Sequence, residues 1–170
     1  MPTPPGPRDV NEDDVAPAGE AIREGDLVVY PTDTVYGLGA DALDTDAIAR
    51  AFELKGRARD RPLSLGVPDV DAALDYADPT DREERFMREF LPGPVTVVAD
   101  RPVTATSANL SGEGSARRVA EVARSVREAA VVLDAGETPG TESTVVDPSL
   151  EDPVIREGAE ADAVRAWLRD

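Results

Sequence analysis

Hydrophobic residues occur along the chain both in short continuous runs and in spaced patterns. Continuous apolar runs bounded by turn residues predict buried strands, and apolar residues that repeat every three or four positions predict helices with one buried face. The predicted strands are residues 27–30, 63–67, 95–99, 103–106, 130–133, 144–147 and 154–156.

Capping residues mark where the predicted helices begin. Asn11, followed by three acidic residues, predicts a helix that stops before Gly25. Asp44 predicts a helix that ends just before Lys55, and Ser115 predicts a helix on the apolar stripe that follows it. The other predicted helices are residues 70–76, residues 81–90 and a short one that ends near Trp167 and Leu168.

The alternation of strands and helices predicts an α/β fold, with one open twisted sheet of mixed strand direction and helices packed on it. We expect a single domain over residues 11–170, preceded by a flexible, proline-rich tail at residues 1–10. The segment 31–40 is polar and punctuated by glycine, and it carries too many hydroxyl groups for a core. We expect this segment to wrap a ligand.

The chain is strongly acidic, with 35 Asp and Glu residues against 18 Lys and Arg residues and a net charge of −17. A dense carboxylate surface stays hydrated in concentrated salt, and the salt screens its self-repulsion. The composition therefore predicts a halophilic protein. In molar salt the long-range force on nucleic acid is weak for either sign of charge, so the net charge does not decide the partners.

Cysteine and histidine are absent from the sequence. Their absence excludes a cysteine nucleophile, a Ser-His-Asp triad, a His or Cys zinc site and disulfide bonds. Any catalysis must use Lys, Arg, Asp, Glu, Ser, Thr, Asn or Tyr side chains. No apolar run approaches membrane-spanning length, so we expect a soluble cytoplasmic protein.

Lys55 is the only lysine beside 17 arginines, and it lies in a basic run that extends to Arg61. An ammonium is a compact, rotatable charge that can grip a phosphate from one side, whereas a guanidinium is a rigid planar fork. Lys55 is therefore a candidate phosphate ligand. The alternative is a chance survivor in a solvated charged run.

The P-loop and the Gly-x-Gly-x-x-Gly turn, which bind nucleotide phosphates in many proteins, are absent. A different polyphosphate cradle can be assembled from basic, hydroxyl and amide groups. The alternatives are an ordinary capped turn at residues 107–112 and a surface cation at Arg156. The candidate cradle consists of Lys55, Arg57, Arg61, residues 104–112, residues 142–144 and Arg156.

Six blocks, in the right order, resemble the Sua5/YciO/YrdC family, the threonylcarbamoyl-AMP synthases. Together they cover about residues 15–165, which makes the resemblance highly specific. The blocks are YPTDTVYGLG at 30–39, KGR followed by RPL at 55–63, LPGPVT at 91–96, SANLSG at 107–112, ESTVVD at 142–147 and IREG at 155–158.

The resemblance implies an open twisted α/β sheet with a concave, positively lined cavity. It also implies a reaction of L-threonine, bicarbonate or CO2, and ATP, which yields threonylcarbamoyl-AMP and pyrophosphate for the N6-threonylcarbamoyladenosine modification of tRNA. The nucleophile is the carbamate of threonine itself, so a site without histidine or cysteine suffices. Mg²⁺ is expected with ATP, and the expected partner is the downstream tRNA threonylcarbamoyl-transfer machinery.

Individual residues take roles from the same resemblance. Lys55 and Arg57 would act on the ATP phosphates as catalytic residues. Thr34 and Ser143 would contact threonine, and Tyr36 would help shape that pocket. No metal site made by protein side chains is expected. The expected ATP-binding residues are Lys55, Arg57, Arg61, Thr96, Ser107, Asn109, Ser115 and Arg156.

Two departures from the family pattern bear on the threonine side of the site. Only ten residues separate Thr96 from Ser107, where the family has a longer stretch with a strand bearing an Arg-x-Pro element and a helix. We expect that unit to be missing, which would leave its neighbouring strands as exposed edges. Gly66 is the second departure, because many relatives carry a polar side chain there.

Two functions are expected as alternatives. The first is the synthase, active or impaired by the missing segment. The second is a noncatalytic RNA-binding or regulatory module that keeps the cavity. A single polyphosphate cradle favours the synthase, because an RNA-binding protein needs a distributed basic surface. The missing segment favours the noncatalytic module.

Overall fold

The computed structural model describes residues 11–97 and 105–169. The chain divides into two compact units: a first unit of Met1–Leu65 with Val103–Gly140, and a second unit of Gly66–Pro102 with Thr141–Asp170. The expected tail at residues 1–10 and parts of the expected strands around residues 98–104 lie outside the described residues.

The first unit is built on a four-stranded sheet in the order β4-β2-β1-β5. Strand β1 pairs in parallel with β5 and antiparallel with β2, which pairs antiparallel with β4. The predicted mixed strand direction is confirmed. Strand β2 lies within the segment expected to wrap a ligand, so part of that segment belongs to the sheet. The strands are β1 (Leu27–Tyr30), β2 (Gly37–Gly39), β4 (Ala105–Ser107) and β5 (Ala130–Val132).

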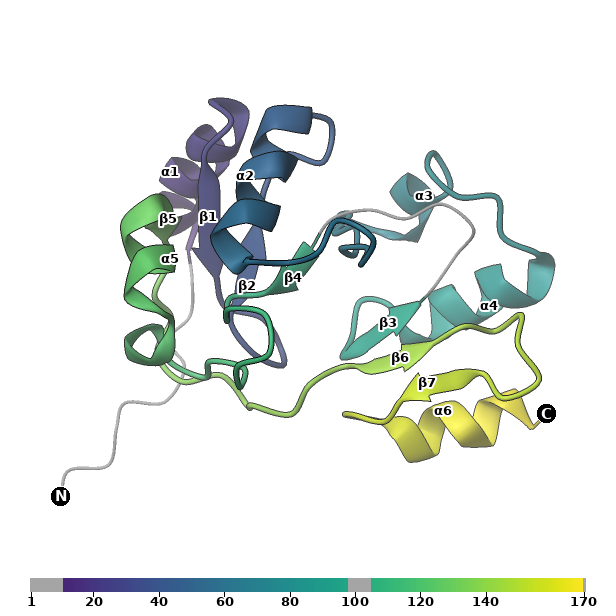
Figure 1. The fold of residues 1–170 in the computed structure, drawn as a ribbon. Helices are drawn as coiled ribbons and strands as arrows, with labels where there is room; N and C mark the ends of the chain where they lie inside the picture. The colour runs from purple at the N-terminus through teal and green to yellow at the C-terminus, as the bar shows by residue number, and fades with distance from the viewer. Residues whose placement is uncertain (1–10, 98–104, 170) are drawn as a thin grey trace, which may run out of the picture. The chain divides into compact units, whose positions relative to one another are not determined.

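Helices cover both faces of this sheet (Figure 1). Helix α1 (Glu12–Arg23) packs against Val28 on one face. Helices α2 (Thr45–Lys55) and α5 (Arg124–Ala129) cover the other face. The division follows from strand geometry, since successive side chains of β1 point to opposite faces. The core under α2 and α5 includes Leu27, Val29, Leu38, Ala51 and Val126.

Local capping sets the helix boundaries. Asn11 and Asp14 form a capping box at the start of α1, and the Asp44 side chain caps α2. Gly56 ends α2 in the left-handed conformation, with φ 59°, which glycine adopts without the steric cost of a Cβ. Helix α2 therefore includes Lys55 as its last residue, one position later than the sequence predicts.

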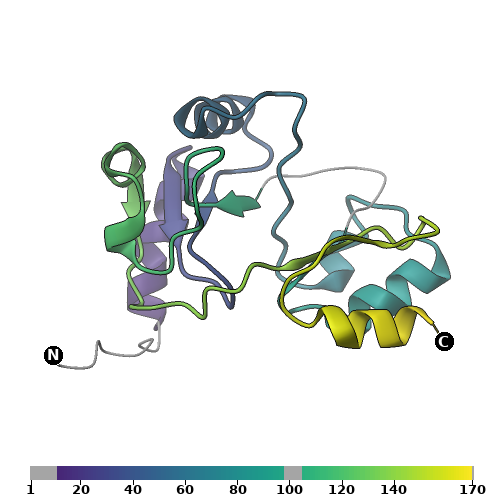
Figure 2. The same cartoon turned by 60° about the horizontal axis from the view of Figure 1, so that its bottom comes forward.

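The second unit has a three-stranded sheet in the order β3-β6-β7. Strand β3 (Val95–Val97) pairs in parallel with β6 (Thr144–Val146), which pairs antiparallel with β7 (Val154–Arg156). Helices α4 (Asp81–Phe90) and α6 (Ala161–Leu168) pack on one face of the sheet (Figure 2).

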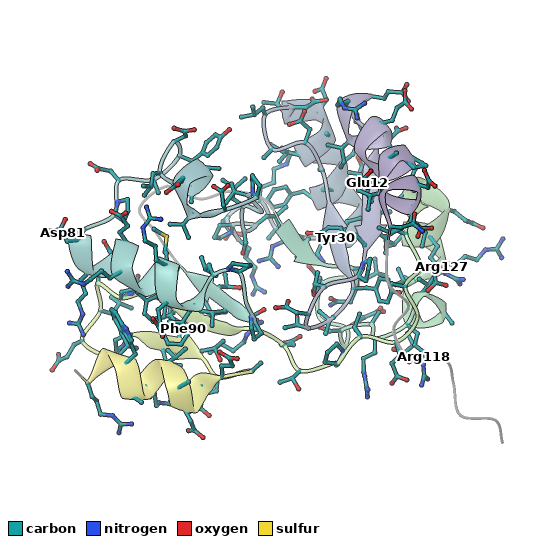
Figure 3. All side chains as sticks on the ribbon, turned by 180° about the vertical axis from the view of Figure 1, so that it is seen from behind. Glu12, Tyr30, Asp81, Phe90, Arg118 and Arg127 are labelled. Atoms are coloured by element: carbon teal, nitrogen blue, oxygen red, sulfur yellow. The ribbon has the colours of Figure 1, made fainter. Side chains whose placement is uncertain are left out.

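Aromatic rings fill the core between α4, α6 and the sheet of the second unit. Phe86 is fully buried, and its ring centroid lies 5.2 Å from that of Trp167 in an edge-on contact. Phe90, at the end of α4 (Figure 3), lies 6.4 Å from the Trp167 ring. Val95 and Val146 supply the strand side of this core. The α/β class with open sheets and flanking helices is thus as predicted.

Several predicted elements differ from the structure. The described strands form two sheets, where one was expected. Residues 63–67 contain a single bridge residue, Ser64, and no strand. Gly66 weakens this run, because glycine has no side chain to pack in a strand. The helix expected at residues 70–76 is only α3 (Val70–Ala73).

The helix expected after Ser115 is also replaced. A short 3-10 helix, η1 (Val119–Glu121), begins after Arg118, and α5 begins only at Arg124. Val122 lies between them with extended backbone and is 2% exposed. The apolar positions are therefore divided between two short helices, η1 and α5, and Val122 is buried between them. None of the helices in the described ranges is long and apolar enough to cross a bilayer.

Candidate active site

Lys55 ends α2, and its ammonium is held by the turn that follows β4. The residue is 3% exposed. Lys55 Nζ donates one hydrogen bond to Ser107 O and another, of 2.8 Å, to Asn109 O. Ser111 N donates to Lys55 O at 2.9 Å in the opposite direction. Three residues expected at the ATP phosphates are thus joined, and the contacts use main-chain carbonyls.

The environment of Lys55 changes its acid-base behaviour. Burial, and to a smaller extent the positive charge of Arg57, lower the pKa of Lys55 from 10.5 to about 8. A buried ammonium loses hydration, which favours the neutral amine. A bound phosphate would act in the opposite direction, because a nearby negative charge favours the ammonium. The protonation of Lys55 is therefore sensitive to an anion close by.

The Asn109 side chain closes the turn. Its Nδ2 donates to Leu110 O at 2.9 Å and to Glu113 O at 2.7 Å. Its Oδ1 is buried and accepts no hydrogen bond from the residues that the structure describes. A buried acceptor without a partner costs roughly 1–3 kcal/mol, so this oxygen is suited to receive an N–H or O–H from water or from a ligand.

Arg57 and Arg61 lie in the loop after α2. Arg57 Nε donates to Arg61 O at 3.2 Å, and Arg57 Nη2 donates to Pro62 O at 2.9 Å. The Arg57 guanidinium thus holds the two ends of its loop together. Arg61 is exposed, so its charge is accessible to an anion from solvent.

Thr34 lies in the bend before β2, and Tyr36 directly precedes that strand. Thr34 is 5% exposed, and its Oγ1 lies 3.0 Å from Thr32 Oγ1. Tyr36 is fully buried. The Tyr36 hydroxyl donates toward Gly136 O at 2.9 Å and accepts from Ala135 N at 3.0 Å. Tyr36 therefore supports the site region from within the core of the first unit.

In the second unit, Thr96 and Arg156 are placed by strand register. Thr96 pairs with Val145, which pairs with Arg156 on the other side. Cross-strand neighbours share a sheet face. Val95 and Val146, the next residues along β3 and β6, point into the core under α4 and α6. Thr96 therefore lies on the face away from those helices. Arg156 stands opposite Val145, at a register irregularity between Val145 and Val146.

Arg156 also contacts the segment that leads into β6. Its Nη2 donates to Ser143 O at 3.1 Å, and its Nη1 lies 3.2 Å from Glu142 Oε2. About half of the Arg156 side chain is exposed. The structure thus brings Arg156 to Ser143, the residue expected at threonine, through the Ser143 main chain.

Gly158 holds the chain after β7 against the same segment. A Cβ at position 158 would lie 2.1 Å from Glu142 O and 2.6 Å from Ser143 O, so glycine alone fits. Gly158 N donates to Thr144 Oγ1 at 3.1 Å, and Ala159 N donates to Glu142 O at 2.8 Å. The path of the chain at Ser143 depends on this contact.

The predicted site residues therefore form separate groups. Lys55, Ser107 and Asn109 are bonded together in the first unit, while Thr96, Ser143 and Arg156 belong to the second. Ser115 is half-buried in the segment before η1. Sequence reasoning missed the role of Gly158, although the IREG block contains it. It also missed the Lys55 acceptors, because a pattern of side chains carries no signal for main-chain carbonyls.

Metal-binding clusters and cavities are the other features that could mark a site. No group of three or more Asp, Glu, His or Cys residues suited to a metal ion occurs among residues 11–97 and 105–169. A hollow of about 420 Å³ lies in the second unit beside Leu150, Val154 and Leu168. None of the expected site residues lines it, so the cavity implied by the resemblance remains a prediction.

An α/β fold that carries a basic loop, a lysine-held turn and a half-exposed arginine on a strand is compatible with a phosphate-binding protein. The profile of the Sua5/YciO/YrdC family, described as telomere recombination, matches residues 20–101 and 98–158. The protein belongs to the Sua5/YciO/YrdC family. The two matched stretches meet inside the short connection between Thr96 and Ser107.

Curated relatives carry the name threonylcarbamoyl-AMP synthase. The relative from Pyrococcus abyssi is 35% identical over 79% of this chain and 50% of its own length. The relative from Bacillus subtilis is 31% identical over 85% of this chain and 53% of its own length. The chain thus spans about half the length of these two relatives.

Two solved structures are similar to most of this chain. A crystal structure of P. abyssi Sua5 complexed with L-threonine has a TM-score of 0.82 and 33% identity, over 92% of this chain and 58% of that one. E. coli YciO has a TM-score of 0.77 over 90% of this chain and 93% of that one. At 21% identity, YciO supports the fold alone.

Proposed function

We propose that the protein is a threonylcarbamoyl-AMP synthase that uses L-threonine, bicarbonate or CO2, and ATP. The observation that carries the proposal is the 35% identity to the P. abyssi relative of that name over 79% of the chain. The similarity to P. abyssi Sua5 complexed with L-threonine supports threonine as the amino-acid substrate.

In the proposed reaction the threonine amine adds to CO2 and loses a proton, which forms a carbamate. A carbamate oxygen then attacks the α-phosphorus of ATP, the bond from that phosphorus to the β-bridging oxygen breaks, and pyrophosphate leaves. Because the substrate supplies the nucleophile, the protein must align the reactants, exclude water and counter the phosphate charge. A chain without His or Cys has the side chains for these tasks.

The proposed roles follow the two groups of residues. In the first unit, Arg57, Arg61 and the Lys55-bound turn would face the phosphates, with Thr34 near threonine and Tyr36 behind it. In the second unit, Ser143 would face threonine. The proposed ATP contacts are Arg57, Arg61, Thr96, Ser107, Asn109, Ser115 and Arg156, while Lys55 holds the turn that carries Ser107 and Asn109.

The setting of the reaction is part of the proposal. Mg²⁺ would arrive with ATP and be held mostly by phosphate oxygens and water. The product would pass to the tRNA threonylcarbamoyl-transfer machinery in the cytoplasm. The net charge of −17 supports a halophilic protein, so assays belong in molar KCl.

Pyrophosphate release tests the proposal. The full chain in molar KCl, with ATP and Mg²⁺, should release pyrophosphate only when both L-threonine and bicarbonate are present. A folded protein without such release would exclude the synthase, and RNA binding by that inactive protein would favour the noncatalytic module.

A matched pair of variants tests the binding site. Arg59 and Arg61 are exposed arginines of one loop, and only Arg61 is assigned to ATP. Arg61→Gln should lower kcat/KM for ATP roughly tenfold, as expected for one lost charged hydrogen bond. Arg59→Gln should leave it unchanged, and equal effects would contradict the assignment of Arg61.

A further inference from the structure

The ammonium of Lys55 differs from the other proposed phosphate-binding groups in where its donors point. Arg61 and Arg156 present charge at the surface, whereas Lys55 is 3% exposed. Two of its three N–H groups donate to Ser107 O and Asn109 O. An ammonium held in this way offers little surface to a phosphate.

We propose that Lys55 is a positioning residue, whose ammonium fixes the turn 107–111 through its main-chain carbonyls and so sets the directions of the Ser107 and Asn109 side chains before a nucleotide arrives. The inference deepens the proposed function, because that function supplies the ligand for the turn. We call the three hydrogen bonds between Lys55 and the turn, to Ser107 O, to Asn109 O and from Ser111 N, the tie. These bonds are present without a ligand.

The tie runs in both directions between α2 and the turn. The side chain of Lys55 donates to the two carbonyls, while Lys55 O accepts from Ser111 N at 2.9 Å. The other side of the turn is fixed by Ala108 N, which donates to Tyr36 O at 2.7 Å. Loss of the ammonium would therefore release one side of the turn and leave the sheet in place.

The chemistry of the contact explains why an arginine-rich chain has its one lysine here. A single tetrahedral nitrogen can direct hydrogen bonds to two carbonyls that diverge from one point. A guanidinium has its five N–H groups in one plane and is larger. Arginine at position 55 would have to displace the turn in order to reach both carbonyls.

Backbone amide exchange in the absence of nucleotide tests the tie. In Lys55→Met, the Ser111 and Glu113 amides should lose protection by roughly tenfold or more, as expected from the loss of charge-assisted hydrogen bonds. The Ser111 amide is a sensitive reporter, because its acceptor is the backbone of residue 55, which the substitution retains. Strand amides of β1 should keep their protection.

Two further variants keep the exchange experiment decisive. Arg59→Gln removes a neighbouring exposed cation and should leave the turn unchanged. Lys55→Arg keeps the charge, and it too should lower the protection of the turn amides. This variant takes the place of Lys55→Met if Lys55→Met does not fold. Protection equal to the wild type at Ser111 and Glu113 in the folded Lys55 variants would overturn the inference.

The route of the effect is tested by a mutant cycle on the KM for ATP. If Lys55 acts through Ser107 and Asn109, Lys55→Met should raise this KM at least tenfold alone and less than threefold in a background that carries both Ser107→Ala and Asn109→Ala. Fully additive effects would show that Lys55 contacts the phosphate directly, and would overturn the positioning role. A wild type that does not use ATP would refute the proposed function. The amide-exchange result would then test by itself whether Lys55 fixes the turn.

Discussion

The two groups of site residues are positioned by different means. In the first unit, Lys55 reaches residues 52 and 54 positions away in sequence through side-chain hydrogen bonds. In the second unit, Thr96 and Arg156 are placed by the register of β3, β6 and β7. A hydrogen-bonded group depends on single polar contacts, whereas a group set by register depends on the path of the backbone. Substitutions should therefore affect the two groups differently.

The largest effect is expected where the backbone path of the second unit is tightest. Gly158→Ala places a methyl group against Glu142 O and Ser143 O, at 2.1 and 2.6 Å. Main-chain atoms cannot rotate away, so we expect a loss of roughly 3 kcal/mol in the free energy of unfolding, as for severe overpacking. Denaturant unfolding in molar KCl measures it.

Gly114→Ala is the matched control for this substitution. Beyond residues 113–115, no heavy atom lies within 4 Å of a Cβ at Gly114. This variant should keep the wild-type stability or gain a few tenths of a kcal/mol, because alanine restricts the unfolded chain. Equal losses for the two variants would mean that Gly158 has no special role in the path at Ser143.

In the first unit, a single hydroxyl tests dependence on polar contacts. Tyr36→Phe leaves Ala135 N and Gly136 O without their bonds to the Tyr36 hydroxyl. We expect roughly 2 kcal/mol of destabilisation, the cost of leaving buried polar groups unpaired. Tyr76→Phe, at a tyrosine that is 41% exposed, should change stability by under roughly 0.5 kcal/mol. A small effect at Tyr36 would remove the contrast between the units.

The elements predicted best are those with local signals. The caps Asn11 and Asp44 located α1 and α2, and the apolar run 154–156 coincides with β7. The division into two sheets had no local signal, since strand pairing is decided by segments far apart in sequence. The expected loss of a strand between Thr96 and Ser107 stays a prediction, because residues 98–104 lie outside the described residues.

The sequence named candidate site residues, and it did not predict how they are bonded. Lys55 and Asn109 were named together from sequence blocks, but their contact runs through a main-chain carbonyl. Tyr36 was expected beside threonine, whereas its burial and its bonds to Ala135 and Gly136 depend on a loop a hundred positions away. Side-chain identity gives no direct information on such partners.

The lowered pKa of Lys55 gives a pH test of the first unit. With a pKa of about 8 in the folded chain against 10.5 as the ordinary value, the unfolded chain binds more protons between these values. Stability from this group therefore rises with pH, and a neutral amine keeps two N–H groups for both carbonyls. Relative to Lys55→Met, the wild type should gain roughly 1.5 kcal/mol between pH 8 and 9.5. A flat difference, measured by urea unfolding, would contradict burial of the ammonium.

The smallest effect on stability is expected at Arg156. Its substitution should instead change the binding of ATP. Arg156→Gln removes a half-exposed ion pair with Glu142, and such pairs contribute under roughly 1 kcal/mol. The KM for ATP should nonetheless rise roughly tenfold, because the proposed charged hydrogen bond from Arg156 to ATP would be lost. Arg124→Gln, which removes the exposed pair with Glu128, should match its stability and leave the KM unchanged. Equal KM values for both variants would contradict the assignment of Arg156 to ATP.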